Sequence, residues 1–541
     1  MKNVKPFTLV LLLGALLLVG GTVTGQERGI AGSEDQELVV SITPSEIVFD
    51  PHHAYSASEA QLFTAIYEGL VTYDPRTLEP IPAAAQSWTV SPNGRVYTFT
   101  IRESARFWDG RPVRAQDFRN SWLRLIDPSE RAEYASLFDI IQGAEAFRTG
   151  RSADPESVGI RALSSTQLQV TLEEPAAHFL KILCHHSFVP IHPLMLSGGD
   201  WNNLTEVPGS GPYYVASRNE REMVLLRNEL YWDRANIVLP KIRYVMIEDP
   251  NMVSQMFNKG QIDWIAGDFS FELINNMDTL VYAPMFATQY FYFSLREESW
   301  KDSRVRKALA LLVPWDEVRR NAAIPASTLV PPIPGYPQVQ GVVSGSDDEA
   351  MKLLAEAGYP EGRGLPTLTF LLPAGAEEIR RMAAVMASVW KEKLDLEISI
   401  SQVPYEQYFA RVNTDPFTIA TLIWIGDFAD PLTFLQLWTG SSNLNNAGFT
   451  DEEFDRLVKR SMGQRGEERY ATLADAERRL LDGAAVLPIS HTPSVNMIDT
   501  EIIDGWYPNP LDIHPFKFMK FAEFTPIPGI VLAPGPNGAG G

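Results

Sequence analysis

An acidic residue follows an apolar stretch in the second half of the chain. Asp427 comes directly after Ile423–Gly426 (Ile-Trp-Ile-Gly). A carboxylate in apolar surroundings is unfavourable unless a cation or hydrogen-bond donors satisfy it. Asp427 could receive a positively charged group or cap a helix that starts near Pro431. Asp430 suits the cap better, because it stands immediately before a proline at the first helical position. A charged partner is therefore the favoured role of Asp427.

Motifs for catalysis are absent from the sequence. It contains no phosphate-binding loop, no H-E-x-x-H and no G-x-S-x-G. The nearest metal-like group is Cys184–His186 with His192, after the apolar stretch Phe179–Leu183. Adjacent side chains on a strand point to opposite faces, so packed or surface histidines are favoured over a metal site. Loop polarity explains His52 and His53 without a ligand. We expect no enzyme, no cofactor and no metal.

Length and charge limit the classes of partner. The 541 residues are too many for one core, so two or three lobes are expected. Lys and Arg number 46 against 67 Asp and Glu, a formal charge of −21, without any Lys/Arg-rich run. This balance argues against nucleic acid or an anionic membrane surface as a partner. The single cysteine, Cys184, excludes an internal disulfide.

The first residues have the pattern of a secretory signal peptide. Lys2 and Lys5 precede the apolar run Phe7–Val19, which opens into small residues. We expect cleavage after Gly25; an uncleaved membrane anchor is the alternative. No cysteine follows the run for lipid attachment, so the mature protein is expected to be free in the periplasm.

Local patterns predict the elements of the first half. Ser58 and Gln61 have the spacing of a capping box at a helix start. Asn93-Gly94 predicts a hairpin, while Phe118–Leu125 has helical spacing and Leu168–Leu172 alternates as a strand. The first half is therefore expected to contain a largely antiparallel sheet.

The second half has the rhythm of a strand, a helix and a strand. Thr367–Leu372, Ile379–Leu394 and Leu396–Ile400 predict a βαβ unit with parallel strands. Two further helices are expected over Asp451–Ser461 and Glu467–Leu481, before an apolar run. The fold class is α/β with mixed sheets. The Pro- and Gly-rich tail from residue 525 is expected to be poorly ordered.

Separate blocks of sequence resemble one bacterial family. The blocks are Leu62–Leu70, Tyr97–Gly110, Gly209–Tyr213, Leu226–Trp232, Asp302–Ala310, Lys352–Tyr359, Asp427–Leu435 and Val486–Ile489. The chain resembles the extracellular solute-binding proteins (family 5) of oligopeptide, dipeptide and nickel ABC transporters, and most of all their oligopeptide-binding branch.

The resemblance implies two lobes that close like a hinge over a ligand, a periplasmic binding protein fold. It implies a first lobe of residues 26–67, 193–286 and 500–541, which carries an extra subdomain of residues 68–192. The second lobe would be residues 287–499. The partners implied are a short peptide and the permease subunits of an ABC transporter in the inner membrane. We expect a monomer.

The resemblance also assigns ligand contacts. Asp427 would receive the α-ammonium of a peptide, with Gly426 beside it. Trp424 and Tyr405 would be aromatic walls that tolerate varied side chains, and Tyr134 would hydrogen-bond the ligand main chain. The backbone of Ala57 would pair with the extended peptide.

The sequence departs from the family pattern at the positions that would hold the far end of the ligand. Relatives can carry Arg at the position of Thr421, which leaves Arg411 as the nearby cation for a ligand carboxylate. A solvated helix charge is the favoured reading of Arg411. The function predicted is a peptide receptor that feeds an ABC importer. The alternatives are another cargo (nickel chelate, haem or an oligosaccharide), a secreted hydrolase, or a chaperone or adhesin with this fold.

Overall fold

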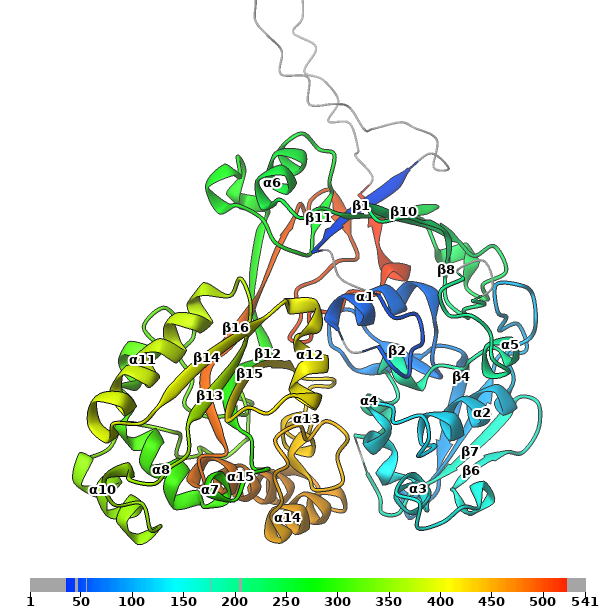
Figure 1. Ribbon diagram of the computed structural model, residues 1–541. Helices are drawn as coiled ribbons and strands as arrows, with labels where there is room; N and C mark the ends of the chain where they lie inside the picture. Colours follow the sequence, from blue (N-terminus) through cyan, green and yellow to red (C-terminus); the bar gives the residue numbers. More distant parts are fainter. Residues whose placement is uncertain (1–35, 44–46, 55, 177, 204–206, 523–541) are drawn as a thin grey trace, which may run out of the picture.

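The structure is a computed structural model that describes residues 36–43, 47–54, 56–176, 178–203 and 207–522. The expected signal peptide and the tail from residue 525 lie outside the described residues. Figure 1 shows two bodies, joined at the top by long strands. One sheet of ten strands runs through both, in the order β14-β13-β15-β12-β16-β11-β1-β10-β9-β8. The α/β fold with a mixed sheet is confirmed.

Lobe I contains the first strands of the chain and its C-terminal segment. Its elements are β1 (Glu37–Ile42), β8 (Tyr213–Arg218), β9 (Glu222–Arg227), β10 (Lys241–Met246), β11 (Trp264–Ile265), β17 (Ile503–Asp504), β18 (Lys520–Phe521), α1 (Ala57–Ile66) and α6 (Pro250–Asn258). Parallel pairing of β1 with β10 and β11 brings distant segments together. Its core gathers around Phe63, Tyr244, Trp264 and Phe516.

A smaller subdomain adjoins lobe I. Its elements are β2 (Val71–Tyr73), β3 (Pro80–Pro82), β4 (Ala85–Val90), β5 (Val96–Ile101), β6 (Ile160–Ala162), β7 (Gln167–Thr171), α2 (Ala115–Leu125), α3 (Ala144–Arg148) and α4 (Phe179–Ile182), and α5 (Pro193–Leu196) leads back to lobe I. The antiparallel sheet β4-β5-β7-β6 confirms the predicted hairpin, with Gly94 at φ +71° in its turn. The amphipathic face of α2 packs Phe118 and Trp122 into the core.

Lobe II carries the predicted βαβ unit. Its strands are β13 (Leu368–Pro373), β14 (Ile398–Val403) and β15 (Ile419–Ile425). Its helices are α7 (Glu298–Lys301), α8 (Ser303–Leu312), α9 (Trp315–Val318), α10 (Asp347–Glu356), α11 (Glu377–Leu394), α12 (Tyr405–Thr414), α13 (Leu432–Leu435), α14 (Glu452–Met462) and α15 (Gly466–Asp482). β13 and β14 pair in parallel across α11, as the spacing predicts.

Two long antiparallel strands connect the bodies. β12 (Leu280–Phe293) pairs with β16 (Val486–Ile498), and the register of the pair shifts between Pro284 and Thr288. At one end β16 meets β11 of lobe I, and β12 meets β15 of lobe II. Because, among the described strands, only β12 and β16 cross between the bodies in the sheet, a bend at the irregular stretch changes the distance between the lobes with little loss of pairing.

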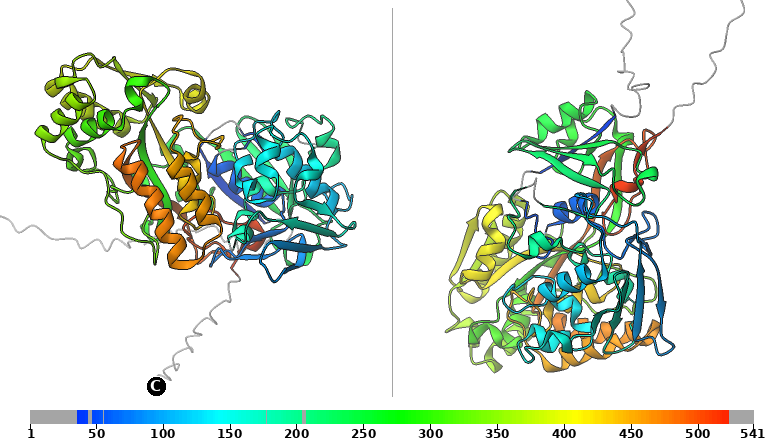
Figure 2. Two further views of the ribbon diagram at one scale, coloured as in Figure 1. Left: turned by 90° about the horizontal axis from the view of Figure 1, so that it is seen from below. Right: turned by 90° about the vertical axis from the view of Figure 1, so that its right-hand side faces the viewer.

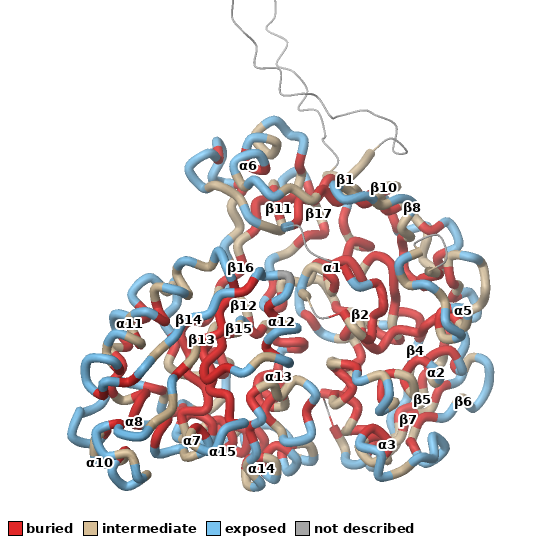
Figure 3. Tube along the Cα trace, viewed as in Figure 1, coloured by how far each residue is buried: buried red, intermediate tan, exposed pale blue. Residues whose placement is uncertain are grey.

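The subdomain packs against lobe II. Buried side chains from residues 70–188 and from residues 286–511 form one continuous apolar cluster. Figure 2 shows the two bodies side by side from below, and Figure 3 shows the buried strands at the centre of each. A third apolar cluster lies under α6. The lobes therefore touch along a seam opposite the crossing strands.

Two local predictions are wrong. The first helix is capped by Ser56 with Glu59, two residues before the predicted pair, and both bonds of the capping box form. The stretch before Cys184 is the short helix α4 rather than a strand. The argument that strand geometry separates Cys184 from His185 therefore does not hold.

Candidate ligand-binding site between the lobes

The loop after β15 faces the subdomain across the seam. The Tyr73 hydroxyl, at the end of β2, donates to the backbone carbonyl of Asp427 at 2.8 Å. The ring of His178 stacks on Phe428 with centroids 6.5 Å apart. Loop 427–430 is thus held between the two bodies, and its side chains point into their contact.

Asp427 is buried at this contact. Its side chain is 5% exposed. Its Oδ2 accepts from the Thr433 hydroxyl at 3.2 Å, and the same hydroxyl accepts from the Asp427 N–H at 2.8 Å. Among the described residues, no Lys or Arg forms an ion pair with Asp427; the recorded partner is His185, with Nε2 at 3.6 Å from Oδ1. The carboxyl group therefore lacks a cationic partner of its own.

The surroundings disfavour the charged form of Asp427. Burial raises the pKa of its carboxyl group to about 8, against the opposing effect of the Thr433 hydroxyl. Burial also disfavours the charged form of His185, and it lowers the pKa of this imidazole to about 3. Near neutral pH the imidazole is uncharged and cannot supply the missing cation. A ligand cation would stabilise the ionised carboxylate here.

Asp430 takes the capping role. Its Oδ1 accepts from the Leu432 N–H at 3.0 Å, and its two oxygens accept from Arg469 at 2.6 and 2.9 Å. The sequence-based assignment of the cap to Asp430 is confirmed, with the helix starting at Leu432. The two acids of one loop therefore have different roles, since Asp430 is matched internally and Asp427 is not.

Two of the predicted aromatic residues lie close to Asp427. Tyr134 stands at the start of the 3-10 helix η1 (Ala135–Ile140) and Trp424 lies in β15; both are 4% exposed. Their ring centroids are 6.5 Å apart across the seam, and the Tyr134 ring is 4.3 Å from that of His185. The two rings come from different bodies, and His185, which contacts both Tyr134 and Asp427, connects them to the acid.

Tyr405 lies farther along the seam. It is the first residue of α12, and the residue is 60% exposed. Crowding by the surrounding protein and the negative charge of Asp268 raise the pKa of its hydroxyl. Asp268 follows β11 of lobe I. Tyr405 therefore faces lobe I across an open part of the seam, away from the buried acid.

The backbone surroundings of Ala57 and Gly426 bear on their expected roles. Ala57 is the first residue of α1, and a helical residue directs its carbonyl into the helix. Its N–H, one of the donors without an intrahelical partner at the start of α1, can still pair with a peptide, and the backbone contact at Ala57 stays a prediction. At Gly426, an added Cβ would lie 2.6 Å from a ring carbon of Phe286 and 2.9 Å from Thr433. Close packing against Phe286 of β12 explains why a residue without a side chain stands at position 426.

Neither position considered for the carboxylate end of the ligand, Arg411 or Thr421, places a positive charge at the seam. Arg411 lies on α12 and pairs with Asp415 one turn later, on an exposed face. The Thr421 hydroxyl donates to the Tyr290 carbonyl at 3.0 Å within the sheet. The position of Arg411 matches the solvated helix charge favoured from the sequence.

Sequence reasoning missed three residues that contact Asp427: Tyr73, His185 and Thr433. Thr433 lies within one turn of the acid, so its spacing was a usable signal. Tyr73 and His185 come from a remote part of the chain, and only the fold brings them to Asp427. Both also line a cavity behind the seam, together with Phe63, Cys184 and His186.

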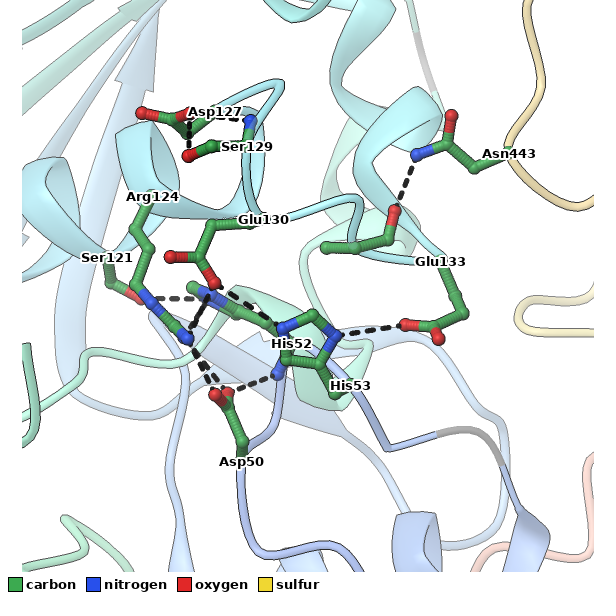
Figure 4. A network of polar contacts seen from close by, with 11 residues as sticks. Asp50, His52, His53, Ser121, Arg124, Asp127, Ser129, Glu130, Glu133 and Asn443 are labelled. Atoms are coloured by element: carbon green, nitrogen blue, oxygen red, sulfur yellow. Dashed lines mark hydrogen bonds and ion pairs between the residues drawn. The ribbon is translucent and has the colours of Figure 1, made fainter. Parts of the chain in front are cut away.

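A second set of contacts closes the rim of the seam. Asn443 of lobe II donates to the carbonyl of Ala132 at 2.7 Å, and Arg148 donates to the carbonyl of Ser441 at 2.9 Å. Figure 4 shows this bond of Asn443 next to Glu133 in the chain. Asp139 holds the Arg148 guanidinium by two bonds of 2.8 and 2.6 Å. The rim therefore adds polar bonds between the bodies away from Asp427.

The remaining histidines have structural partners. His52 is fully buried against Ser121 and Arg124 (Figure 4), and burial lowers its pKa to about 3. His53 lies between Glu130 and Glu133 at 3.4 and 3.5 Å. Within the described ranges, no three His, Cys, Asp or Glu side chains are grouped as a metal site. None of the helices in the described part of the chain is long and apolar enough to cross a membrane.

Comparison with known proteins identifies the fold family. The family model for bacterial extracellular solute-binding proteins, family 5 (middle region), matches residues 79–446. The dipeptide-binding protein DppE of Bacillus subtilis is 26% identical over 93% of this chain and 96% of its own length. The Escherichia coli murein tripeptide binding protein MppA superimposes with a TM-score of 0.81, at 27% identity, over 91% of this chain and 99% of that chain.

A second structure of MppA shows how the lobes are arranged. Its unliganded open form superimposes with a TM-score of only 0.62, at 28% identity, over 90% of this chain and 98% of that chain. Identity and coverage are nearly the same in the two comparisons, so the arrangement of the bodies makes the difference. The lobes of this chain are therefore not in the open arrangement, in agreement with the buried seam. The chain belongs to the bacterial extracellular solute-binding proteins of family 5.

Proposed function

We propose that this protein is a periplasmic receptor that captures short peptides between its lobes and delivers them to the permease of an ABC importer. One observation carries the proposal: Asp427 is a buried carboxyl group in an aromatic wall at the seam, without a Lys or Arg partner among the described residues. Every unblocked peptide brings a cation at its first atom.

The geometry favours an ammonium group over other ligand groups. A carboxylate accepts hydrogen bonds from a cation more strongly than from a neutral donor, because both charges contribute. A neutral sugar hydroxyl would leave the carboxylate without its opposite charge, and an anionic ligand would repel it. The neighbouring rings of Tyr134 and Trp424 offer contact area that does not depend on one side chain. This combination suits a ligand with a constant positive end and variable side chains.

The relatives support the class of ligand. DppE is named as a dipeptide-binding protein and MppA as a murein tripeptide binding protein. For this chain we further propose a secreted location, with residues 1–25 as a cleaved signal peptide, a monomeric state and docking on permease subunits in the inner membrane. In this proposal the protein has no catalytic activity. The units that move on closure are residues 26–67, 193–286 and 500–541 with subdomain 68–192, against residues 287–499.

The experiment is a pair of binding measurements on the purified protein. Native mass spectrometry of protein purified without refolding identifies molecules retained from the cell. Titration calorimetry then compares trialanine with N-acetyl-trialanine at pH 7. We expect retained peptides, and binding of trialanine that is at least tenfold tighter than binding of the acetylated form. Retention of a nickel complex, haem or a sugar without measurable peptide binding would refute the proposal.

A further inference from the structure

A histidine of the subdomain approaches the proposed amine-binding group. His185 precedes the 3-10 helix η3 (His186–Phe188), and its Nε2 lies 3.6 Å from Oδ1 of Asp427. Both side chains are almost fully buried, at 6% and 5% exposed. The distance exceeds that of a hydrogen bond, so the contact is a close electrostatic approach rather than a full bond. The ring lies in front of Oδ1.

The hydrogen bond on the other ring nitrogen fixes the tautomer. Nδ1 of His185 accepts from the Ser187 N–H at 3.3 Å. A neutral imidazole that accepts at Nδ1 carries its proton on Nε2. Burial lowers the pKa of His185 to about 3, so the ring is neutral near pH 7. His185 therefore presents an N–H group to the carboxyl group of Asp427.

An incoming ammonium needs the same oxygen. Oδ2 of Asp427 already accepts from the Thr433 hydroxyl at 3.2 Å, and Oδ1 is the oxygen that His185 faces. An ammonium group has three N–H donors and no acceptor, and the Nε2–H of this tautomer is also a donor. Two donors do not bond to each other, and the buried His185 ring in front of Oδ1 occupies the space that an ammonium group needs to reach that oxygen.

We infer that His185 is an internal competitor for the amine-binding position, and that the amino group of a peptide displaces it from Asp427 on binding. This inference rests on the proposed function. The ring has space to move, because His185 lines the cavity behind the seam with Tyr73 and Cys184. Competition lowers the affinity for peptide, and the return of the ring to Asp427 assists release.

Two substitutions distinguish the roles of the two ring nitrogens of His185. His185→Asn retains an acceptor near the position of Nδ1, which can still receive the Ser187 N–H, and lacks the Nε2–H. His185→Gln retains a donor near the position of Nε2. We expect His185→Asn to bind trialanine about two- to tenfold more tightly than the unaltered protein, and His185→Gln to bind it with nearly unaltered affinity. Binding of N-acetyl-trialanine should not change.

His178 provides the matched control. It is another buried histidine of the subdomain at the seam, and it contacts Phe428 instead of Asp427. His178→Asn should not tighten the binding of trialanine. Unaltered or weaker binding of trialanine by His185→Asn would overturn the inference. A His185 side chain that only packs, or that assists the binding of peptide, gives that result.

A measurement without peptide separates this inference from the proposed function. Nitrogen-15 NMR of the ligand-free protein at pH 5, where the closed form is favoured, should show His185 protonated at Nε2, with a signal that moves on Asp427→Asn while that of His178 stays in place. An unmoved His185 signal overturns the inference even if trialanine binds. A moved signal in a protein that does not bind trialanine supports the contact and refutes the proposed function alone.

Discussion

Replacing Asp427 by asparagine removes a charge and little else. The side chain keeps its size, and its amide oxygen can still accept from the Thr433 hydroxyl. A hydrogen bond to a charged group contributes about 1.5–3 kcal/mol net. Its loss should weaken the binding of trialanine by about tenfold to 150-fold. The binding of N-acetyl-trialanine should not weaken, because that ligand brings no cation.

The same substitution should alter how the lobes close without peptide. In the closed form burial raises the pKa of Asp427 to about 8, whereas a solvated carboxyl group has its ordinary value near 3.8. Between these values the closed form holds a proton that the open form has released, so rising pH favours opening. At about 1.4 kcal/mol per pH unit, the penalty on closure at pH 7 is about 4 kcal/mol. The asparagine variant lacks this penalty.

Calorimetry at pH 7 and small-angle X-ray scattering of the peptide-free protein at pH 5 and pH 9 test both parts. We expect the radius of gyration of the unaltered protein to increase with pH and that of Asp427→Asn to stay constant. Two results would refute the reasoning: equal affinities of the two proteins for trialanine, or an equal dependence of their shapes on pH.

Three other substitutions test the surroundings of the site. Asn443→Ala removes the rim bond to Ala132, and should speed peptide dissociation about two- to tenfold in stopped-flow measurements while the melting temperature stays constant; an unaltered rate would contradict the rim contact. Gly426→Ala places a methyl group against a buried phenylalanine ring, and should lower the free energy of unfolding by about 1–3 kcal/mol in urea titrations, where full stability would refute the packing argument. The hydrogen bond to Glu133 raises the pKa of His53 above 6.5, so its stabilising effect is complete below that pH and is lost as the pH rises. His53→Gln should therefore lower the melting temperature at pH 5 and leave it unchanged at pH 9, and equal effects at both pH values would contradict the assignment.

Much of the fold is predictable because its signals are local. The turn at Asn93-Gly94 and the apolar stripe of α11 depend on neighbouring residues, and both form where the sequence places them. Local signals also fail when two of them compete. Ser56 with Glu59 and Ser58 with Gln61 have the same capping spacing. The first pair forms the box, because Glu59 accepts from the Ser56 N–H and the Ser56 hydroxyl accepts from the Glu59 N–H.

The candidate site is only partly predictable for a physical reason. Asp427 is conspicuous in the sequence because an acid in an apolar segment requires an explanation. Tyr73 and His185 carry no comparable signal, since their contacts with Asp427 exist only after two lobes meet. The stretch before His185 is short and apolar, and such runs fit a strand or a helix equally well. Its helical form, α4, is decided by packing.

The most direct test of the account is a crystal structure of the protein with trialanine bound. The account predicts the amino nitrogen of the ligand within about 3 Å of a carboxylate oxygen of Asp427, with the His185 ring turned away from it. A ligand whose carboxylate end, side chain or main chain lies at Asp427, with the amino nitrogen elsewhere, would contradict the central claim.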